Sequence, residues 1–240
     1  MATLASIMNR LVSESTAQVE LRMREHFIES LKGLKTLGLS PSSRVLSIST
    51  GDGIWDYLTL KTLGNEINLV ATDVVSNPVK KDDQILLQKL GKWSFVQVAA
   101  DGALPFANDS FDFIYHQDVI EHTQKPYGFV KEQFRVLKPG GTLLCGTPNL
   151  FRPANVLKLL MGRLRFPVKI GANEEIGDYI HECEFHERHL ELLLRESGFS
   201  QVRVDSVFFG LHFLNLQFSA FPASAWGRLM SHYIVSLSQK

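Results

Sequence analysis

A pair of glycines and a following acid form the first pattern that could carry chemistry. Gly51 and Gly53 directly follow an apolar run, and Asp73 ends the next one. Glycines there let the backbone turn tightly beside a ligand, and the acid can accept hydrogen bonds from both hydroxyls of a ribose. A turn that merely needs glycine is the structural alternative. A dinucleotide is disfavoured, because Asp56 stands where its fingerprint has a third glycine.

More polar residues follow the third and fourth apolar runs. The Asp101 carboxylate, followed by Gly102, can accept a hydrogen bond from an exocyclic amine such as that of adenine, or can close an Asx turn. The fourth run ends in a cluster of imidazoles and carboxylates, namely His116, Asp118, Glu121 and His122. Because ligands of parallel sheets bind beyond the carboxyl ends of the strands, this cluster is expected beside the substrate.

The elements that must position these residues are visible in the apolar pattern. Short β-branched runs predict strands covered on both faces at 44–49, 68–73, 93–98, 111–116 and 142–147. Segments with helical spacing alternate with them, such as a helix expected from Pro126 through Leu137 and closed by the Pro-Gly-Gly at 139–141. This alternation implies βαβ units and a parallel sheet. Two later runs, 202–209 and 232–238, are expected to pair antiparallel at its edge.

The start of the chain predicts an amphipathic helix, because Met23, Phe27, Leu31 and Leu34 recur at helical spacing. We find no internal repeat, low-complexity tract or linker. The sequence therefore predicts one domain over 1–240, with residues 1–40 as a helical cap.

The composition excludes several classes of protein. The 240 residues are 45% hydrophobic and 21% charged, which argues against a disordered chain. The 25 basic residues are balanced by 25 acidic ones, so no nucleic-acid partner is expected. Two cysteines cannot build a disulfide framework, and neither a membrane-spanning run nor a secretion signal is recognisable. A cytoplasmic protein is the expectation.

Taken together, several segments resemble the class I S-adenosylmethionine-dependent methyltransferases, more narrowly a small-molecule branch with an E-H pair after the fourth strand. They are VLSISTGDG, VATD, AADGALPFANDSFDFIYHQDVIEH, RVLKPGGTLLCGTPN and EFHERHLELLLRESGF, in collinear order over roughly 40–200. The resemblance implies an α/β, Rossmann-like sheet of seven mostly parallel strands with the last strand antiparallel and helices on both faces.

The same resemblance implies cofactor-binding roles for matching positions. The methionine part of the cofactor would lie at Ser49, Thr50, Gly51 and Gly53, and its amino acid end near Gln117. The ribose would lie at Asp73 and Val74, and the adenine at Asp101 and Gly102. The first loop departs from the family pattern, which has an acid where Ser47 stands and a glycine where Ser49 stands. Asp52, inside the loop, is a candidate to replace the missing charge.

The resemblance also makes His122 the candidate base, with His181 as a second catalytic residue, because imidazole titrates near neutral pH. The structural alternative is a histidine that orders the start of a helix. No metal is part of this prediction. A divalent ion such as Mg²⁺, Mn²⁺ or Zn²⁺ is the alternative, held by Asp118, Glu121, His122 and His181. Asp118 would be one methylene shorter than the Glu expected there.

The histidine-rich segment 181–189 matches no standard zinc signature. By the resemblance it precedes a helix that Gly198 ends, with Leu190, Leu193 and Leu194 on the buried face. His186 and His189 are then surface residues, and of the histidines in this segment only His181 is expected at the active site.

The acceptor side is expected in two insertions. Residues 150–182 would form a lid, with an apolar stripe at Leu157, Leu160, Met161 and Leu164. Basic residues and no acid surround the stripe, at Arg152, Lys158, Arg163, Arg165 and Lys169. Such a segment can hold an anionic substrate, lie on a membrane surface, or pack on the core with a solvated basic face. The connection 207–230 holds five phenylalanines within 207–226, and also Trp226, which indicates core, a subunit contact or an apolar pocket.

We therefore predict a methyltransferase that uses S-adenosylmethionine to methylate a hydroxyl of a small anionic or amphiphilic acceptor, one that contains a sugar or a lipid. Methylation at carbon or nitrogen is an alternative. Another is a non-catalytic module that binds the cofactor or S-adenosylhomocysteine, although His122 and His181 favour an enzyme. Peripheral membrane contact and an oligomer formed through 207–226 are the further partners considered.

Overall fold

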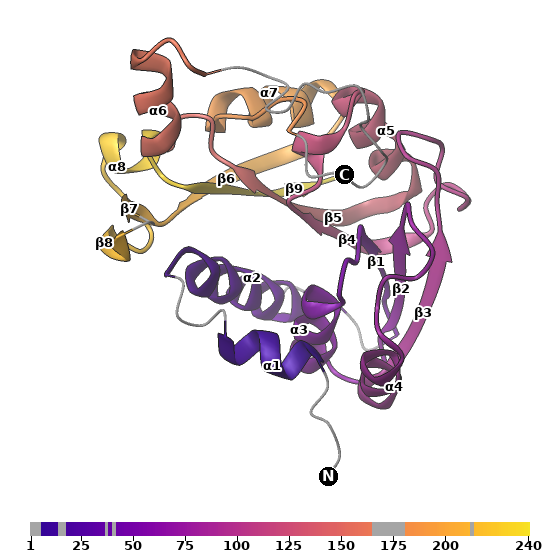
Figure 1. Ribbon diagram of the computed structural model, residues 1–240. Helices are drawn as coiled ribbons and strands as arrows, with labels where there is room; N and C mark the ends of the chain where they lie inside the picture. Colours follow the sequence, from indigo (N-terminus) through magenta and orange to yellow (C-terminus); the bar gives the residue numbers. More distant parts are fainter. Residues whose placement is uncertain (1–5, 14–17, 37, 40–41, 165–180, 212–213) are drawn as a thin grey trace.

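The computed structural model describes residues 6–13, 18–36, 38–39, 42–164, 181–211 and 214–240 (Figure 1). Its main sheet contains β1 (Arg44–Ile48), β2 (Asn68–Asp73), β3 (Lys92–Gln97), β4 (Phe111–Gln117), β5 (Leu137–Pro148), β6 (Ser200–Val207) and β9 (Tyr233–Gln239). The strand order is β3-β2-β1-β4-β5-β9-β6. The first five strands are parallel, and β9 runs antiparallel to both β5 and β6. The predicted seven-stranded sheet with an antiparallel last strand is confirmed.

Helices cover both faces of this sheet (Figure 1). One face carries α1 (Ser6–Ser13), α2 (Gln18–Thr36), α3 (Ile54–Leu63) and α4 (Lys81–Leu90). The other carries α5 (Pro126–Val136) and α7 (Glu187–Glu196). Two smaller helices are α6 (Pro153–Leu160) and α8 (Ala225–Leu229). Within the described residues, no helix combines the length and the apolar character needed to cross a membrane.

The core consists of two apolar clusters, one on each face of the sheet. Val45 of β1 belongs to the cluster under α2 and α3, while Leu46 belongs to the cluster under α5 and α7. Successive side chains of a strand point to opposite faces, so an almost continuously apolar strand fills both clusters. The four residues that predicted an N-terminal helix, Met23, Phe27, Leu31 and Leu34, are buried on α2.

Two predicted boundaries are wrong. Leu137 belongs to β5 and not to the preceding helix, because α5 ends at Val136 and the chain continues directly as a strand through the Pro-Gly-Gly segment. The third predicted strand is not covered on both faces, since Trp93 is the one buried residue of β3. This strand lies at the edge of the sheet and pairs with β2 alone.

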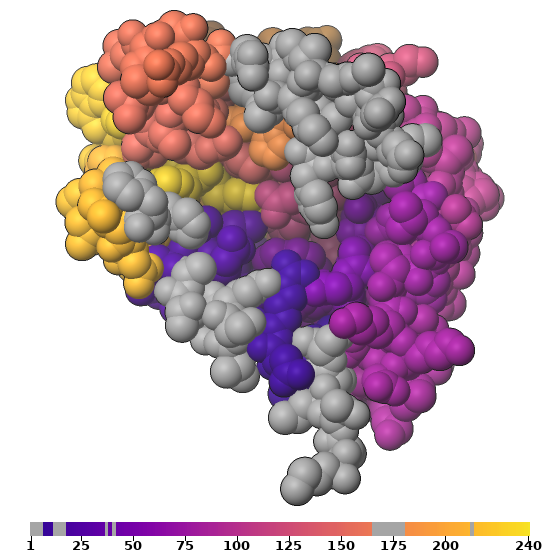
Figure 2. All heavy atoms as spheres, in the orientation of Figure 1, coloured from indigo at the N-terminus to yellow at the C-terminus, as the bar shows by residue number. Residues whose placement is uncertain are grey.

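The chain between β6 and β9 contains a small hairpin that the sequence did not predict. It consists of β7 (Phe209–Leu211) and β8 (Leu216–Ser219), separated from β6 by Phe208, whose φ is 58°. Phe208 itself is buried, whereas Phe218 and Trp226 are exposed. In Figure 2, this yellow and orange region and the salmon helix α6 form one side of the molecule.

Candidate active site

Three loops meet at the carboxyl ends of β1, β2 and β4. Thr50 N donates to Thr72 O at 2.9 Å, and Gly51 N donates to the Asp73 side chain at 3.1 Å. After β4, Asp118 N donates to Gly146 O of β5 at 3.0 Å. Parallel neighbours end at the same edge of a sheet, so the residues predicted to bind the cofactor lie together there.

The first loop turns through left-handed backbone conformations. The φ angles of Ser49, Gly51 and Gly53 are 57°, 54° and 87°. A Cβ atom on Gly51 would meet nothing within 4 Å, so the space beside this residue is open. One on Gly53 would lie 3.2 Å from Leu87, because this glycine packs under α4 and begins α3. A ligand can therefore approach the backbone of the loop at Gly51, whereas Gly53 is packed against neighbouring side chains.

The backbone of Ser49 is strained, because its φ of 57° lies in the left-handed region that favours glycine. A substitution by glycine tests this strain. A residue other than glycine in the left-handed conformation costs roughly 1–2 kcal/mol. We expect Ser49→Gly to raise the free energy of unfolding by about 0.5–1 kcal/mol, after the entropy that glycine adds to the unfolded chain. Urea unfolding measures this. Ser76→Gly, at an exposed position without positive φ, is the control and should be destabilising. A loss of stability in Ser49→Gly would contradict the strain.

The Asp73 carboxylate is held by backbone donors at the end of β2. Its oxygens accept hydrogen bonds from Gly51 N at 3.1 Å and Val75 N at 3.3 Å. Val74 is half-buried, and its carbonyl accepts a hydrogen bond from the Gln97 side chain at 3.0 Å. A rigid acceptor group beside an open glycine loop fits the ribose of a nucleoside.

Asp101 and Gly102 lie in the loop after β3. Asp101 has a φ of 49°, and its side chain accepts a hydrogen bond from Gln124 N at 3.1 Å. This contact joins the loop to the segment after η2 (Ile120–His122) and is not an Asx turn. The Asp101 side chain is exposed, so it remains accessible to a second donor.

The Gln117 side chain points away from the loops and into the sheet. Its Oε1 accepts a hydrogen bond from the Tyr233 hydroxyl at 2.9 Å. A Cβ on Gly146 would lie 1.8 Å from this oxygen, so the contact depends on glycine in β5. The Gln117 side chain is thus engaged within the sheet, and the contact predicted for it with the cofactor stays a prediction.

The buried acid under the first loop is Asp56, the residue that breaks the dinucleotide fingerprint. This fully buried carboxylate accepts hydrogen bonds at 2.7 Å from Thr50 Oγ1, Trp93 Nε1 and Tyr115 OH. Burial raises the pKa of Asp56, and hydrogen bonds from Ser47 and its other donors oppose that rise. Asp56 thus holds the loop through Thr50.

Asp52 does not take the place of the acid missing at Ser47. Its side chain forms an ion pair with Arg10 of α1 and accepts a hydrogen bond from Ile54 N at 3.3 Å. Asp56 instead brings a carboxylate to Ser47 from α3. The sequence shows no signal for this, because Trp93 and Tyr115 come from other strands.

His122 and His181 are brought together by a backbone contact between distant segments. Glu182 N and Cys183 N both donate to the Glu121 carbonyl, at 2.9 and 3.3 Å. The two imidazole rings lie 4.9 Å apart at an angle of 88°. Both side chains are about one quarter exposed. The two predicted catalytic residues thus share one position at the carboxyl ends of the strands.

The buried Glu184 side chain holds His181 in place from the interior of the protein. Its buried carboxylate accepts two hydrogen bonds from the Arg152 guanidinium and one from the Asn155 amide, all at 2.6 Å. His181 Nδ1 lies 2.7 Å from the same carboxylate, which directs its Nε2 outward. Burial alone would raise the pKa of Glu184, but His181 and Arg152 hold it below its usual value. Arg152 is therefore engaged here, and no sequence pattern singled out Glu184 as the residue that holds it.

Glu121 completes the group. It is fully buried, and its Oε2 accepts a hydrogen bond from Thr147 at 2.9 Å. Its Oε1 has no hydrogen-bond partner among the described residues and lies 4.0 Å from His122 Nε2. Burial, followed by repulsion from Asp118, raises the pKa of Glu121 well above its usual value.

These side chains fit a divalent cation. Glu121, His122 and His181 each offer one ligand atom, and these atoms lie within 4.8 Å of one another. Imidazole and carboxylate ligands suit Mn²⁺ and Zn²⁺, and Glu184 would support His181 from behind as metal-bound histidines require. A cation would also satisfy Glu121 Oε1. Asp118, the fourth residue of the predicted set, does not join this group.

Asp118 lies in the same region with a φ of 54°. Its side chain is accessible to solvent, yet desolvation by the surrounding protein, followed by repulsion from Glu20, raises its pKa to about 7. Asp118 and Glu121 repel each other when both are ionised, and a cation bound beside them would relieve that repulsion.

His116, the remaining member of the predicted cluster, is not part of the site. It is buried in β4 with its ring 5.3 Å from that of Phe129. Burial, only partly opposed by Gln133, lowers its pKa from 6.5 to about 3. The alternation of strand residues explains this, because it turns His116 toward the face of the sheet where Phe129 of α5 packs.

The neutral state of His116 predicts an acid-sensitive fold. Below pH 6.5 His116 binds a proton in the unfolded chain, but in the folded protein it stays neutral down to about pH 3. The free energy of unfolding therefore falls as the pH drops from about 6.5 toward 3. The expected slope is about 1.4 kcal/mol per pH unit. Urea unfolding at several pH values measures it, and His116→Phe should flatten it. His189→Phe, at an exposed histidine, should leave it unchanged. Equal slopes in all three proteins would contradict the prediction.

The apolar stripe of the predicted lid does not pack on the core in the described residues. Leu157, Leu160 and Met161 of the apolar stripe are exposed, and Leu164 is half-buried. Arg165 and Lys169 lie outside the described residues. As predicted, His189 is exposed, and Leu190 and Leu194 are buried.

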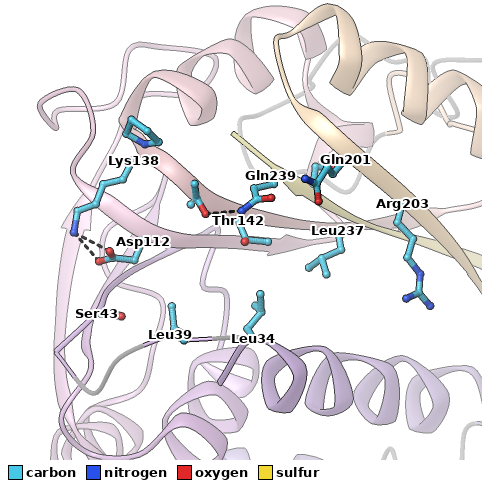
Figure 3. A pocket seen from close by; sticks show the side chains of 15 residues that line it. Leu34, Leu39, Ser43, Asp112, Lys138, Thr142, Gln201, Arg203, Leu237 and Gln239 are labelled. Carbon is cyan, nitrogen blue, oxygen red and sulfur yellow. Dashed lines mark hydrogen bonds and ion pairs between the residues drawn. The ribbon is translucent and has the colours of Figure 1, made fainter. Parts of the chain in front are cut away.

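A cavity at the opposite edge of the sheet is distinct from this site (Figure 3). It is lined by residues at the amino ends of β4 and β5, including Asp112 and Lys138, whose side chains are 2.8 Å apart. Ligands of parallel α/β sheets bind at the carboxyl ends, so this cavity is not the cofactor site.

Comparisons with known proteins agree with this geometry. A family model described as "Methyltransferase domain" matches residues 46–145. Demethylmenaquinone methyltransferases of Staphylococcus aureus are 23% identical over 206 residues, which cover 82% of this chain and 84% of theirs. A possible histamine N-methyltransferase from Thermotoga maritima superposes with a TM-score of 0.61 at 18% identity, covering 97% of this chain and 95% of that one.

A further solved structure, an S-adenosylmethionine-dependent methyltransferase from Archaeoglobus fulgidus, gives a TM-score of 0.60 at 15% identity. It covers 96% of this chain and 99% of that one. The matched domain contains the first loop, Asp73, Asp101 and the end of β4. Fold, loop geometry and domain match agree: residues 46–145 match a methyltransferase domain, and the chain has the Rossmann-like fold of S-adenosylmethionine-dependent methyltransferases.

Proposed function

We propose that the protein methylates a hydroxyl group of a small amphiphilic molecule, with His122 as the base. The observation that carries this proposal is the pairing of His122 with His181 beside the carboxyl ends of β4 and β5. Both rings are partly accessible, and Glu184 orients one of them. A hydroxyl must lose its proton on methylation, and an imidazole near neutral pH suits that task.

Different residues of the chain would bind the cofactor and take the proton of the acceptor. S-Adenosylmethionine supplies an electrophilic methyl group when bound. Asp73 would hold the ribose and Asp101 the adenine amine, which fixes the donor relative to the sheet. His122 would take the proton of the acceptor hydroxyl, while the acceptor oxygen bonds to the methyl carbon and the carbon–sulfur bond breaks. S-Adenosylhomocysteine and the methylated acceptor are the products.

Two observations support an amphiphilic acceptor. The demethylmenaquinone methyltransferases, at 23% identity, carry a name that refers to a lipid-soluble quinone. The segment next to the site, α6, exposes Leu157 and Leu160 and carries Lys158. An acceptor with an apolar part and negative charge suits such a segment.

A divalent cation is a second candidate for activating the hydroxyl. It is favoured by the three ligand atoms within 4.8 Å and by the buried Glu121 Oε1, which has no hydrogen-bond partner in the part of the chain that the structure describes. Glu121, His122 and His181 would hold the ion, which would lower the pKa of the bound hydroxyl. Calorimetric titration with Mn²⁺ decides between the two. Saturable binding that is lost in His181→Ala supports the cation, and no binding leaves His122 as the base.

Cofactor binding tests the first half of the proposal. Calorimetry should show binding of S-adenosylmethionine and S-adenosylhomocysteine but not of NAD. Asp73→Ala should weaken binding at least about ten-fold, since two charge-assisted hydrogen bonds are lost. Asp82→Ala, at an exposed acid on α4, is the matched control. Tight NAD binding would overturn the proposal.

Release of S-adenosylhomocysteine tests the second half. Amphiphilic phenols and quinols are the first acceptors to offer, and mass spectrometry of the product locates the methyl group. Methylation at oxygen that is lost in His122→Ala supports the proposal. A methyl group on carbon or nitrogen would overturn it, and cofactor binding without turnover over a broad acceptor panel would favour a non-catalytic module.

A further inference from the structure

We infer that one edge of the molecule binds the surface of membranes that contain anionic lipids. This apolar edge consists of α6 with the turn that follows it, residues 153–163, and of residues 214–230 around β8 and α8. The inference goes beyond methyl transfer, because membrane binding requires neither cofactor nor acceptor.

The apolar edge leaves large apolar side chains uncovered. Leu160 is 81% exposed, Trp226 72% and Phe218 65%. Leu157, Met161 and Phe221 are exposed by about half. Folded proteins seldom gather so many uncovered apolar side chains in one place, and such patches mark interaction surfaces.

The two parts of the apolar edge share one anchor. Asn149 Nδ2 donates to Leu229 O at the end of α8, at 3.0 Å. The Asn149 carbonyl accepts from Arg152 N, directly before α6, at 3.1 Å. Figures 1 and 2 show α6 and α8 on the same side of the molecule. The helices that carry Leu160 and Trp226 therefore lie on the same side of the molecule.

The charge of the apolar edge favours an anionic partner. The sequence has no Asp or Glu from 151 to 173 or from 206 to 240, although its 25 acids equal its basic residues in number. Lys158 and Arg163 are exposed on and beside α6. Arg228 of α8 pairs with Glu187 of α7. Basic residues beside an apolar helix face are the pattern of helices that lie in the headgroup region of a membrane.

A membrane surface fits better than the other occupants. A second copy, packed through the same edge about a two-fold axis, would set two surfaces against each other that carry basic residues such as Lys158 and Arg163 and no acid from 153–163 or 214–230. A membrane-spanning helix needs about 20 residues. The eight residues of α6 are enough only to lie on the surface.

The apolar edge also begins at the candidate active site. Arg152, directly before α6, pairs with Glu184, which contacts His181. An amphiphilic acceptor drawn from the bilayer would arrive beside these residues. This last step rests on the proposed function, whereas membrane binding itself does not.

Vesicle sedimentation tests the inference. The wild-type protein without cofactor should sediment with vesicles of equal parts phosphatidylcholine and phosphatidylglycerol, and much less with phosphatidylcholine alone. Trp226 is a built-in reporter, since Trp93 is buried and Trp55 is half-buried. Its fluorescence should move to shorter wavelength when the apolar edge enters the headgroup region.

Variants locate the contact. Leu160→Ser combined with Trp226→Ser should weaken partitioning at least about ten-fold. Ile85→Ser, on the helix α4 and 50% exposed, is the matched control and should partition like the wild type. Lys158→Glu with Arg163→Glu should weaken binding to the anionic vesicles by about five-fold or more.

Three results would overturn the inference. They are absence of binding to either vesicle, binding that the Leu160 and Trp226 substitutions do not change, and a dimer in light scattering that those substitutions dissociate. The last would assign the edge to a second copy. Cofactor titration of the same variants keeps this test separate from that of methyl transfer, because Asp73 and the first loop remain intact.

Discussion

Replacement of Asp56 by alanine is expected to destabilise the protein by roughly 3–5 kcal/mol, one of the two largest effects we predict. The substitution leaves Thr50, Trp93 and Tyr115 as buried donors without their acceptor, and each such group costs about 1–3 kcal/mol. Asp56→Asn keeps one oxygen acceptor and should lose about half as much. Urea unfolding followed by circular dichroism measures both variants.

The same substitution should weaken cofactor binding more than the loss of a surface acid does. Asp56 holds Thr50, whose backbone lies between Ser49 and Gly51 of the first loop. Asp52→Ala is the matched control, because Asp52 lies in that loop but makes a partly exposed ion pair with Arg10, worth at most about 1 kcal/mol. If Asp52→Ala were the more damaging of the two, Asp56 would not be the anchor.

A relocation variant tests whether Asp56 replaces the acid absent at Ser47. Asp56→Ala combined with Ser47→Asp returns a carboxylate to the strand while it removes the one from α3. Partial recovery of stability and of S-adenosylmethionine affinity, relative to Asp56→Ala alone, is expected because the Ser47 side chain already reaches the Asp56 carboxylate. No recovery would show that the donors around Asp56 require its position on α3.

Asp56 also illustrates which parts of the fold the sequence could predict. The central strands β1 and β4 were predictable because each is a short apolar run that the two helical layers bury. The partners of Asp56 come from three elements, and no local pattern records their meeting. Helix ends were less predictable for a related reason. Leu137 continues the helical spacing of α5, but pairing with Phe111 places it in β5.

In the candidate site, too, some residues could be placed from the sequence and others could not. The cofactor side follows from strand ends, so the first loop, Asp73 and Asp101 could be placed from order and spacing. The Gln117 side chain could not, because its direction is set by Gly146 and Tyr233 of neighbouring strands. Family resemblance pointed to His122 and His181. Their contact depends on hydrogen bonds from 182–183 to the Glu121 carbonyl, which spacing does not encode.

Replacement of Glu184 by glutamine is expected to have the second large effect, a loss of about 3–5 kcal/mol, because it leaves the Arg152 guanidinium without a counter-charge inside the protein. The Glu184 pKa lies below its ordinary 4.5 in the folded protein, so the stabilising effect is complete above pH 4.5 and is lost as the pH falls below it. The stability difference between wild type and Glu184→Gln, measured by urea unfolding, should therefore shrink in acid. Glu182→Gln, at a half-buried neighbour, is the control and should cost little at any pH.

A double-mutant cycle shows whether the unpaired Arg152 causes that loss. Arg152→Met combined with Glu184→Gln removes both charges, so the pair should cost less than the sum of the two single substitutions, with a coupling of about 1–3 kcal/mol. Additive costs would mean that Glu184 stabilises the protein mainly through Asn155 and His181, which it also contacts. In that case Asn155→Ala should reproduce much of the loss while Arg152→Met is nearly neutral. Either result bears on catalysis, because the group that stabilises α6 is the one that holds His181 toward His122.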